Sequence, residues 1–264
     1  MGLKLVVVGA AGRMGRRILA LAIDSGHFDI VGAVETAGHP EIGKDAGAVA
    51  GMERLGVQVG EAWPAEADVA IDFSLPDGAG TTVANCRNKG IALVMGTTGL
   101  APDQQDAVKA AASEVPVIYG TNMSVGMNLL FALVGKAAAM LGDAYDIEIV
   151  EQHHRFKKDA PSGSALTLAE RICEATGRPC PDSLTHGRSG QAPRKQGEIG
   201  MHAVRAGDIT GIHSVIYSTL GETITLNHTA HTRETFVRGA LRAAEWLPGK
   251  PPALYTMADV LGIE

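Results

Sequence analysis

The chain has 264 residues, of which 45% are hydrophobic and 20% charged, and its formal net charge is −6. This length and composition exclude a disordered chain and allow one large or two modest globular domains. The acidic balance argues against a broad nucleic-acid-binding face, which would have to be basic, so we expect no nucleic-acid partner.

Through the first half of the chain, short apolar strands alternate with helical patterns, which is typical of βαβ units around a parallel sheet. One helix is predicted over residues 13–26, where it ends at a glycine, and a second over residues 101–113, where it opens at a proline. The predicted strands cover residues 4–8, 30–34, 69–73, 91–95 and 115–119.

The pattern changes after Asn122. A long apolar helix over residues 124–142 leads into an alternating strand over 146–151, and a further helix is predicted over 165–175. The glycine- and proline-rich segment 176–200 is predicted to be a long loop, with a length typical of a functional lid. Closely spaced strands, which predict antiparallel pairing, and a last helix then follow at residues 200–205, 213–218, 222–227 and 234–246.

These elements predict an α/β fold with two domains. The first is a Rossmann-type, doubly wound parallel sheet over residues 1–123, to which residues 234–264 return. The second is an α+β domain over residues 124–233. A turn rich in small residues follows two of the later parallel strands, at 96–99 and at 120–126, on the edge where ligands of such sheets bind. Ordinary βα turns are the alternative for either one.

Cysteine content and hydropathy bear on the compartment. The three cysteines are odd in number and lack metal-ligand spacing, so we expect reduced thiols in a reducing compartment. The apolar start of the chain leads into glycines and arginines, which fits a buried strand better than a signal peptide. We count no run near the ~20 apolar residues that span a bilayer. A cytoplasmic protein with no membrane partner is therefore predicted.

Three glycines, Gly9, Gly12 and Gly15, follow the first strand at a spacing of three and precede the first helix. Glycines there permit a tight turn and close backbone approach, and the helix N-terminus offers N–H groups to a pyrophosphate. The spacing departs from the stricter GxGxxG pattern, so a strand–turn–helix packing motif is the alternative. Glu35 ends the second strand, where a carboxylate accepts hydrogen bonds from ribose hydroxyls, and this favours a nicotinamide dinucleotide.

The residues around Glu35 also bear on the choice of cofactor. A carboxylate repels a 2′-phosphate, and the next residue, Thr36, supplies no cation to offset it. We therefore expect NADH to be used at least as well as NADPH, although Arg13 can still reach a phosphate.

The stretch 151–170, EQHHRFKKDAPSGSALTLAE, concentrates titratable chemistry. His153 and His154 are neighbours in an extended segment and point to opposite sides, and no HExxH or Cys/His spacing accompanies them, so we expect no metal. His153 suits a general acid near neutral pH, and Lys157 can stabilise developing negative charge or assist proton delivery. Solvated lysines beside a surface helix cap are the alternative.

Downstream, Ser162, Gly163 and Ser164 lead into the predicted helix and form an anion site of N–H and hydroxyl donors. Arg233 can add a bidentate contact to a carboxylate. Cation, imidazole and helix N-terminus together suit a small dicarboxylate. Asp159 is predicted to be structural, orienting Lys157 or Arg155. Structural or surface roles are expected for five further histidines: His186, His202, His213, His228 and His231.

Longer motifs make the pattern specific. The chain contains VVVGAAGRMG, IDFSLPDG, GTTG, TNMSVGMN, EQHHRFKKDAPSGSA and RAGDITGIH. On these motifs it resembles, from end to end, the 4-hydroxy-tetrahydrodipicolinate reductase family, long called dihydrodipicolinate reductases, of bacterial lysine and diaminopimelate biosynthesis. The histidine–lysine–PSG motif is highly specific, whereas the glycine loop alone is not.

The resemblance implies a cofactor domain over residues 1–123 and 234–264, and a substrate-binding domain over 124–233 whose strands form the contacts of a homotetramer. It implies that NADH or NADPH gives hydride to a cyclic dicarboxylic imine formed from 4-hydroxy-tetrahydrodipicolinate with loss of water, yielding tetrahydrodipicolinate. We expect the cleft to lie between the domains and to close when both ligands bind.

The resemblance also implies residue roles. His153 is the expected proton donor and Lys157 its catalytic partner, and the substrate is held by His154, Gly163, Ser164 and Arg233. The cofactor-binding positions are Gly9, Ala10, Ala11, Gly12, Arg13, Met14, Glu35, Gly96, Thr97, Thr98, Gly120, Thr121, Asn122 and Met123.

Three positions depart from the better-known family pattern. Thr36 stands where some members place an arginine that receives the 2′-phosphate, and Met123 stands where some place an aromatic residue near the nicotinamide. Ser164 replaces the commoner threonine but keeps the hydroxyl. These departures bear on cofactor preference and leave the reaction class as expected.

Two other functions are compatible with a fold of this kind, since fold alone does not fix function. One is another two-domain NAD(P)-dependent dehydrogenase, which would have no use for the complete histidine–lysine–PSG cluster. The other is a non-catalytic, dinucleotide-responsive regulator, which saturable cofactor binding without turnover would favour.

Overall fold

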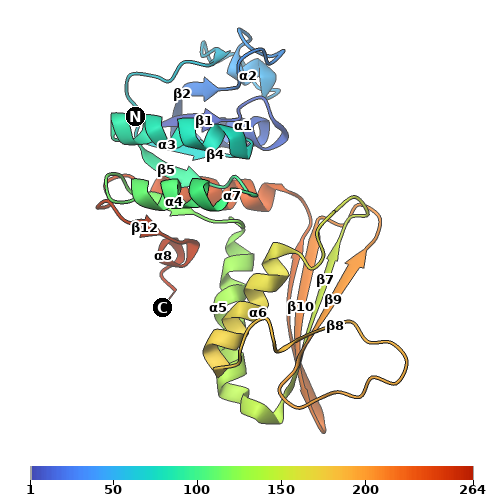
Figure 1. Ribbon diagram of the computed structural model, residues 1–264. Helices are drawn as coiled ribbons and strands as arrows, with labels where there is room; N and C mark the ends of the chain where they lie inside the picture. Colours follow the sequence, from blue (N-terminus) through green and yellow to red (C-terminus); the bar gives the residue numbers. More distant parts are fainter. Residues whose placement is uncertain (1, 264) are drawn as a thin grey trace. The chain divides into compact units, whose positions relative to one another are not determined.

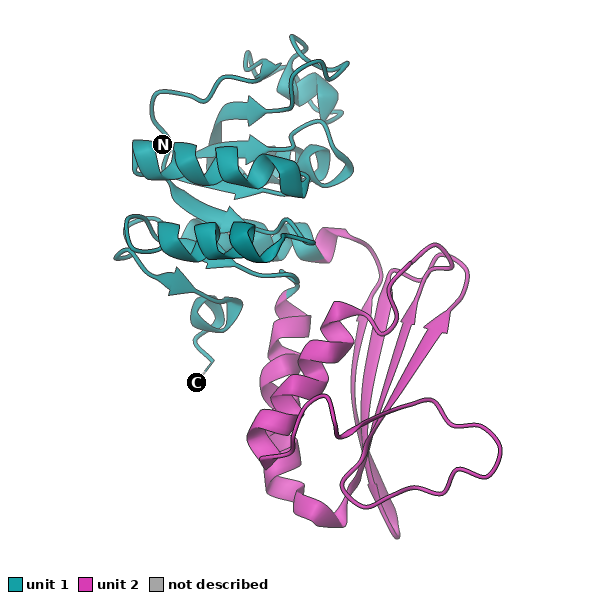
Figure 2. Cartoon of the chain, in the orientation of Figure 1, with its two compact units in different colours: residues 1–124, 236–264 teal, residues 125–235 magenta. Residues whose placement is uncertain are grey.

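The computed structural model describes residues 2–263 and divides into two compact units (Figure 2). The first comprises residues 1–124 and 236–264, and the second comprises residues 125–235. The boundaries expected from the sequence, after residues 123 and 233, differ from these by one or two residues. Each unit has its own sheet and its own hydrophobic core.

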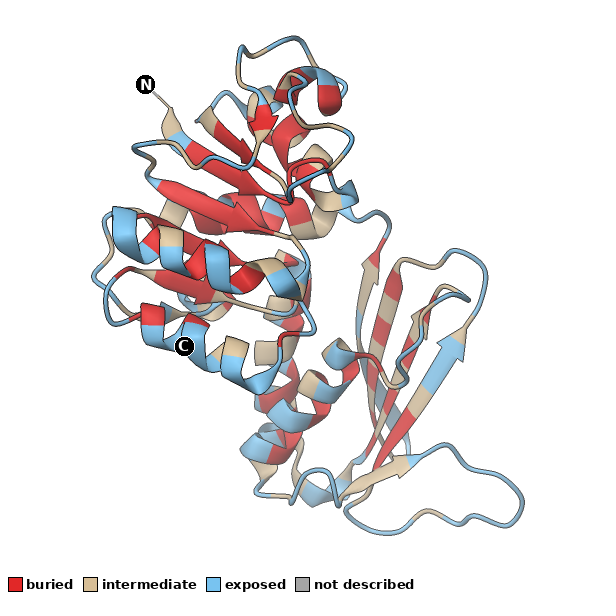
Figure 3. Cartoon of the chain, turned by 45° about the horizontal axis from the view of Figure 1, so that its top comes forward, coloured by how far each residue is buried: buried red, intermediate tan, exposed pale blue. Residues whose placement is uncertain are grey.

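The first unit is built on a seven-stranded sheet in the order β12-β6-β5-β4-β1-β2-β3, and all its strands are parallel (Figure 1). Strands β4 and β5 are buried throughout, as Figure 3 shows in red, because they carry apolar residues on both faces. This confirms the Rossmann-type sheet. The strands are β1 (Leu3–Val8), β2 (Phe28–Val34), β3 (Val59–Gly60), β4 (Val69–Asp72), β5 (Ala92–Met95), β6 (Val117–Tyr119) and β12 (Leu254–Tyr255).

The helices of the first unit connect these strands. Helix α1 ends at Gly26, whose φ of 67° is the left-handed conformation that glycine adopts most readily, as the sequence predicted. Helix α3, which follows Gly78 and carries Gly80 in its first turn, was missed, as were the short α2 and α8. The helices are α1 (Arg13–Ser25), α2 (Ala46–Val49), α3 (Ala79–Lys89), α4 (Pro102–Ala111), α7 (Glu234–Trp246) and α8 (Met257–Leu261).

The second unit has a five-stranded mixed sheet in the order β11-β10-β7-β9-β8. Strand β10 is antiparallel to β11 and β7, whereas β9 is parallel to β7 and β8. The predicted antiparallel pairing of consecutive strands is therefore confirmed for β10 and β11. It is wrong for β9 and β10, because β7 lies between those two strands. The strands are β7 (Asp146–His153), β8 (Leu184–His186), β9 (Ile199–Arg205), β10 (Gly211–Thr219) and β11 (Glu222–Ala230).

Helices α5 (Val125–Leu141) and α6 (Gly163–Thr176) pack on each other, and their apolar sides share one core with the sheet. Residues 125–144 meet the length and composition of a membrane span, which the sequence count above did not recognise. In the structure Met127, Leu130 and Val134 of α5 are buried in the core of the second unit. These contacts place one side of α5 in that core, while Leu129, Leu133 and Met140 of the same helix are exposed.

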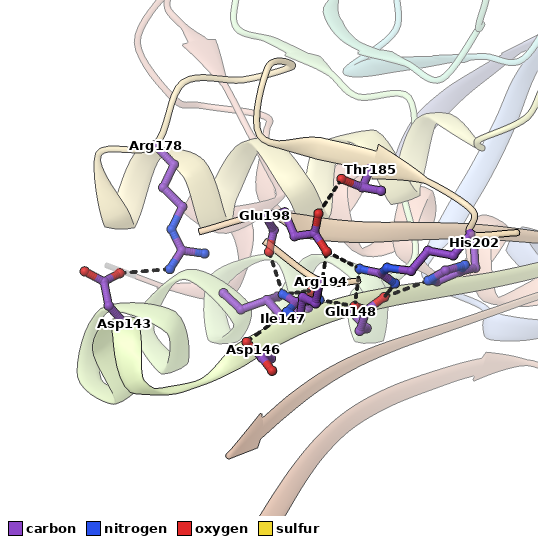
Figure 4. Close-up of polar contacts among 10 residues, drawn as sticks. Asp143, Asp146, Ile147, Glu148, Arg178, Thr185, Arg194, Glu198 and His202 are labelled. Carbon is purple, nitrogen blue, oxygen red and sulfur yellow. Dashed lines mark hydrogen bonds and ion pairs between the residues drawn. The ribbon is translucent and has the colours of Figure 1, made fainter. Parts of the chain in front are cut away.

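The segment expected to be one long loop contains β8, and its remainder is tied to the sheet by an ion cluster around Glu148 (Figure 4). Arg188 donates to Glu148 (3.0 Å) and to Glu198 (2.6 Å), and Arg194 bonds to Glu148 and to the carbonyl of Glu198. His202 Nε2 lies 2.7 Å from the Glu148 carboxylate. Strand alternation places Glu148 and His202 on the sheet face opposite the helices.

Candidate active site

The glycine loop forms a close turn at the carboxyl end of β1. The N–H groups of Gly9 and Ala10 both donate to the carbonyl of Val34, and the Gly12 N–H donates to the carbonyl of Gly9. A Cβ at Gly15 would lie 2.0 Å from the carbonyl oxygen of Gly9, so only glycine lets the first turn of α1 approach the loop this closely. The loop thus presents its backbone beside the N-terminus of α1.

Glu35 follows β2 and faces the glycine loop. Its Oε2 accepts a hydrogen bond from the Ala11 N–H at 3.0 Å, and its Oε1 accepts one from the Thr36 N–H at 2.9 Å. Arg16, to which no role was assigned from the sequence, braces the other side of the turn by donating from Nε to the Ala11 carbonyl at 2.7 Å. The carboxylate predicted to meet a ribose therefore stands against the loop predicted to meet a pyrophosphate.

The turn after β5 is supported by a buried carboxylate. Asp72 is fully buried at the end of β4, and it accepts bonds from the Thr97 hydroxyl (2.8 Å) and the Ser74 N–H (2.7 Å). The Thr97 hydroxyl is thus engaged within the protein, so a contact of Thr97 with a cofactor has to come from its backbone. Gly96 is packed so closely on the Phe73 ring that a Cβ would lie 2.4 Å from Cζ, whereas Thr98 is exposed.

The turn after β6 completes this edge of the sheet. Gly120, Thr121 and Asn122 are partly or fully exposed there, but Met123 is only 1% exposed. The sulfur and methyl group of Met123 lie beside the Gly120 backbone. Met123 therefore supports this turn from inside the protein.

These turns fit a dinucleotide. A pyrophosphate requires a glycine loop without side chains and the N-terminus of a helix, and α1 supplies such a terminus with 13 residues behind it. A ribose requires a carboxylate at the end of the neighbouring strand. The structure brings these groups together at the carboxyl edge of one sheet, with the exposed Arg13 and partly exposed Met14 opening α1.

In the second unit, His153 is the last residue of β7 and is 9% exposed. Its Nδ1 lies 2.6 Å from the carboxylate of Glu151, which is fully buried on the same face of the strand. Burial alone would raise the pKa of Glu151, but hydrogen bonds from His153, Arg205 and the Ser162 N–H outweigh it and lower the pKa to about 2. Glu151 is a site residue that the sequence analysis missed.

Lys157 lies in the turn after β7, where its N–H donates to the carbonyl of His154. Its ammonium is 2.9 Å from the Asp159 carboxylate, which confirms the predicted pairing of Asp159 with Lys157. Burial would raise the pKa of Asp159, but the hydrogen bond from Lys157 outweighs it and lowers the pKa. The Lys157 side chain remains 22% exposed.

Ser162 is the N-cap of α6, and its hydroxyl accepts the Ala165 N–H at 3.2 Å. The same hydroxyl lies 3.2 Å from Nε2 of His213, and Ser162 is only 2% exposed. Its hydroxyl is therefore part of the support of the site, while Gly163 is exposed and Ser164 is partly exposed at the first turn of α6.

His213 was grouped with structural or surface histidines, and the structure places it against His153. The rings of His153 and His213 meet edge to face with centroids 5.2 Å apart. Burial, together with the neighbouring His153, lowers the pKa of His213 to about 3, so its ring is neutral near pH 7. The glycine of the GIH motif and strand alternation are signals that sequence reasoning can use, since Gly211 and His213 share a face of β10.

The other expected substrate contacts are on the same unit. His154 is partly exposed, and its Nδ1 makes no hydrogen bond to any residue in the part of the chain that the structure describes. Arg233 is exposed just before α7. Between residues 2 and 263, no group of three or more His, Cys, Asp or Glu side chains gathers in a metal-binding arrangement.

Comparison with known proteins decides the family. Residues 3–123 match the profile described as "Dihydrodipicolinate reductase, N-terminus", and residues 126–261 match "Dihydrodipicolinate reductase, C-terminus". The chain belongs to the dihydrodipicolinate reductase family. A 4-hydroxy-tetrahydrodipicolinate reductase of Anaeromyxobacter dehalogenans (strain 2CP-1) is 49% identical, with 98% of each chain covered. One of Alkalilimnicola ehrlichii is 46% identical over 98% of this chain and 99% of its own.

Solved structures agree on the fold of this family member. A dipicolinate-bound dihydrodipicolinate reductase from Paenisporosarcina sp. TG-14 has a TM-score of 0.73 at 22% identity, covering 98% of this chain and 99% of its own. An amine dehydrogenase from Mycobacterium smegmatis has a TM-score of 0.64 at 14% identity, covering 97% and 95%. At these identities the likeness concerns the fold, which enzymes of different activity share.

Proposed function

We propose that the chain reduces 4-hydroxy-tetrahydrodipicolinate, with loss of water, to tetrahydrodipicolinate in lysine and diaminopimelate biosynthesis, with NADH or NADPH as reductant. The observation that carries the proposal is the His153 site, in which a buried, carboxylate-bound imidazole adjoins a turn bearing Lys157 and the N-terminus of α6. The 46–49% identity to reductases over the whole chain supports the same reaction.

The first unit would hold the cofactor through the turns at residues 9–14, 96–98 and 120–123 and through Glu35. When bound, the reduced nicotinamide supplies the hydride. The glycine loop and the α1 N-terminus bind the pyrophosphate, and the Glu35 carboxylate binds the adenine ribose.

The second unit would bind and protonate the substrate. His153 donates a proton from Nε2, since its Nδ1 is engaged by Glu151. The Lys157 ammonium stabilises the negative charge that develops on the ring as hydride arrives. Ser164, Gly163 and the first-turn N–H groups of α6 receive one carboxylate, with Arg233 and His154 as further contacts. Asp159 holds the Lys157 ammonium in place.

We also propose that the protein is a cytoplasmic homotetramer assembled through the second unit. One sheet face packs on α5 and α6, while strand alternation turns Val150, Ile212, Ile216 and the 40% exposed Val204 to the opposite face. A row of apolar side chains on a sheet face without helices supports pairing with a second copy of the chain.

Growth without added diaminopimelate tests the proposed reaction in cells. The wild-type gene is expected to restore growth of a bacterial strain that lacks this reductase, because the step has no substitute in such a strain. The His153→Ala variant, expressed to the same level, is expected not to restore it. Failure of the wild-type protein to support growth, despite soluble expression, would contradict the proposed reaction.

Cofactor choice gives a second prediction. Glu35→Ala is expected to weaken NADH binding about tenfold or more, because hydrogen bonds to a charged group contribute roughly 1.5–3 kcal/mol. The same change removes the repulsion of a 2′-phosphate, so NADPH binding should weaken less or strengthen. Titration calorimetry with both cofactors measures the two effects. An equal loss of both cofactors would contradict the role of Glu35.

A further inference from the structure

Glu151 is buried beside His153, the proposed acid, and each of its carboxylate oxygens has two polar partners. Its Oε2 lies 2.6 Å from His153 Nδ1 and accepts from Arg205 at 2.8 Å, while its Oε1 accepts from Arg205 at 2.7 Å and from the Ser162 N–H at 2.9 Å. The side chain of Glu151 is 0% exposed, and that of Arg205 is 19% exposed. Two parallel bonds from one guanidinium to one carboxylate form a rigid fork.

This arrangement determines which nitrogen of His153 is available. Glu151 stays ionised near neutral pH because the hydrogen bonds described above lower its pKa, so it can accept and cannot donate. The hydrogen between the two side chains must therefore sit on Nδ1 of His153, which leaves Nε2 as the reactive atom. A Cβ at Gly211 would lie 3.3 Å from that Nε2, so glycine keeps the space beside it clear.

Arg205 connects the histidine to the turn that carries Lys157. Besides holding Glu151, its guanidinium donates to the carbonyl of Asp159 at 2.6 Å. The carboxylate of Asp159 in turn pairs with the Lys157 ammonium at 2.9 Å. Arg205 thus contacts both Glu151, the partner of His153, and the backbone of Asp159, whose carboxylate holds Lys157.

The charged and titratable groups around His153 agree with this arrangement. Glu151 is the carboxylate in direct contact, and the charge of Arg205 is already shared with it. His213, packed edge-on, is neutral near pH 7. Lys157 is close enough to His213 to act on it electrostatically. Glu151 therefore supplies the negative charge in contact with the His153 ring.

We propose that Glu151 and Arg205 are positioning residues of the reductase site. Glu151 fixes the hydrogen on Nδ1 of His153 so that Nε2 carries the transferable proton, and Arg205 docks the turn bearing Lys157 through the Asp159 carbonyl. The kinetic part of this inference rests on the proposed function, whereas the state of the His153 ring does not.

Nitrogen-15 NMR of the histidine side chains, without substrate or cofactor, tests the ring directly. The full-length wild-type protein is expected to show hydrogen on Nδ1 of His153, assigned by loss of its signals in His153→Gln. In Glu151→Gln, whose amide can donate as well as accept, the Nδ1–H form should no longer be enforced. A wild-type ring with hydrogen only on Nε2 would overturn the proposal, even if Glu151→Gln did not fold.

Kinetics of the same variant test the consequence. Glu151→Gln is expected to lower kcat about 10²-fold or more with little change in substrate KM, since loss of the correct tautomer is that costly in comparable sites. The pH at which kcat falls on the alkaline side should move downward, because the substitution removes a negative charge in contact with the proposed acid. A kcat profile that keeps its wild-type alkaline limb would reduce Glu151 to a structural role and overturn the proposal.

Glu148→Gln is the matched control, because Glu148 lies on the same strand and also contacts a histidine and arginines, but on the other face of the sheet. It should leave the His153 signals and the alkaline limb unchanged. Arg205→Lys, which keeps the charge but loses the fork, should lower kcat while His153 retains hydrogen on Nδ1; wild-type turnover would overturn the assignment of Arg205. If the wild-type protein does not reduce the substrate, the proposed function fails, and the NMR result still decides the role of Glu151.

Discussion

Replacing His153 with alanine is expected to lower kcat by about 10²- to 10⁴-fold, the usual contribution of a positioned general acid. NADH affinity should change little, because the contacts of His153 are with Glu151 and His213 of the second unit, whereas the proposed cofactor turns belong to the first. Steady-state kinetics with freshly generated substrate, together with NADH titration, measures the two effects separately.

The control for this prediction is His202→Ala. His202 is also a strand histidine bound to a glutamate, with 2.7 Å between Nε2 and Glu148, but it lies on the face of the sheet opposite the proposed site. Its loss should leave kcat near the wild-type value. Equal losses of kcat and NADH affinity in His153→Ala would contradict the role assigned to His153.

Gly15→Ala is expected to damage both stability and cofactor binding. The added Cβ would lie 2.0 Å from the Gly9 carbonyl oxygen and 2.7 Å from the Ala10 Cα. Both are backbone atoms, so no side-chain rotation can relieve the overlap, and the loop or α1 must move. We expect a loss of at least ~1–3 kcal/mol in the free energy of unfolding, as is typical of overpacking. NADH should bind at least about tenfold more weakly, a difference of ~1.4 kcal/mol.

Urea unfolding and calorimetric titration with NADH measure the two effects of Gly15→Ala. Gly80→Ala is the matched control, since Gly80 lies in the first turn of α3 with no atom within 4 Å of the position of a Cβ. That change should leave NADH binding intact and stabilise the protein by up to ~1 kcal/mol through helix propensity. Wild-type stability and NADH affinity in Gly15→Ala would refute the account of the glycine loop.

The turns proposed to hold the cofactor could be located from the sequence because their structure follows local rules. A glycine loop between strand and helix and an acidic residue ending the next strand have a fixed meaning in a parallel sheet, whose strands all end at one edge. Strands β3 and β12 were missed because each has only two residues, which are too few for a local pattern. Each is defined by its pairing with a longer neighbouring strand. Helix α3 was missed because glycines and polar residues weaken its apolar pattern.

The residues that hold His153 were harder to predict. Glu151 was within reach of sequence reasoning, because residues two apart in a strand point to the same face. Arg205 and His213 were not, because their approach depends on β7 pairing with both β9 and β10, and consecutive strands had suggested a different order. Long-range pairing fixes these contacts, and a single sequence does not contain it in a local pattern.

Loss of reduced-nicotinamide absorbance, with substrate generated from pyruvate and aspartate semialdehyde by a separate synthase, is the sharpest test of the proposed reaction. We expect synthase-dependent oxidation, with NADH used at least as well as NADPH, and its near-complete loss in His153→Ala. Saturable binding of both cofactors with no oxidation of either would contradict the proposed reaction and would favour a dinucleotide-responsive regulator.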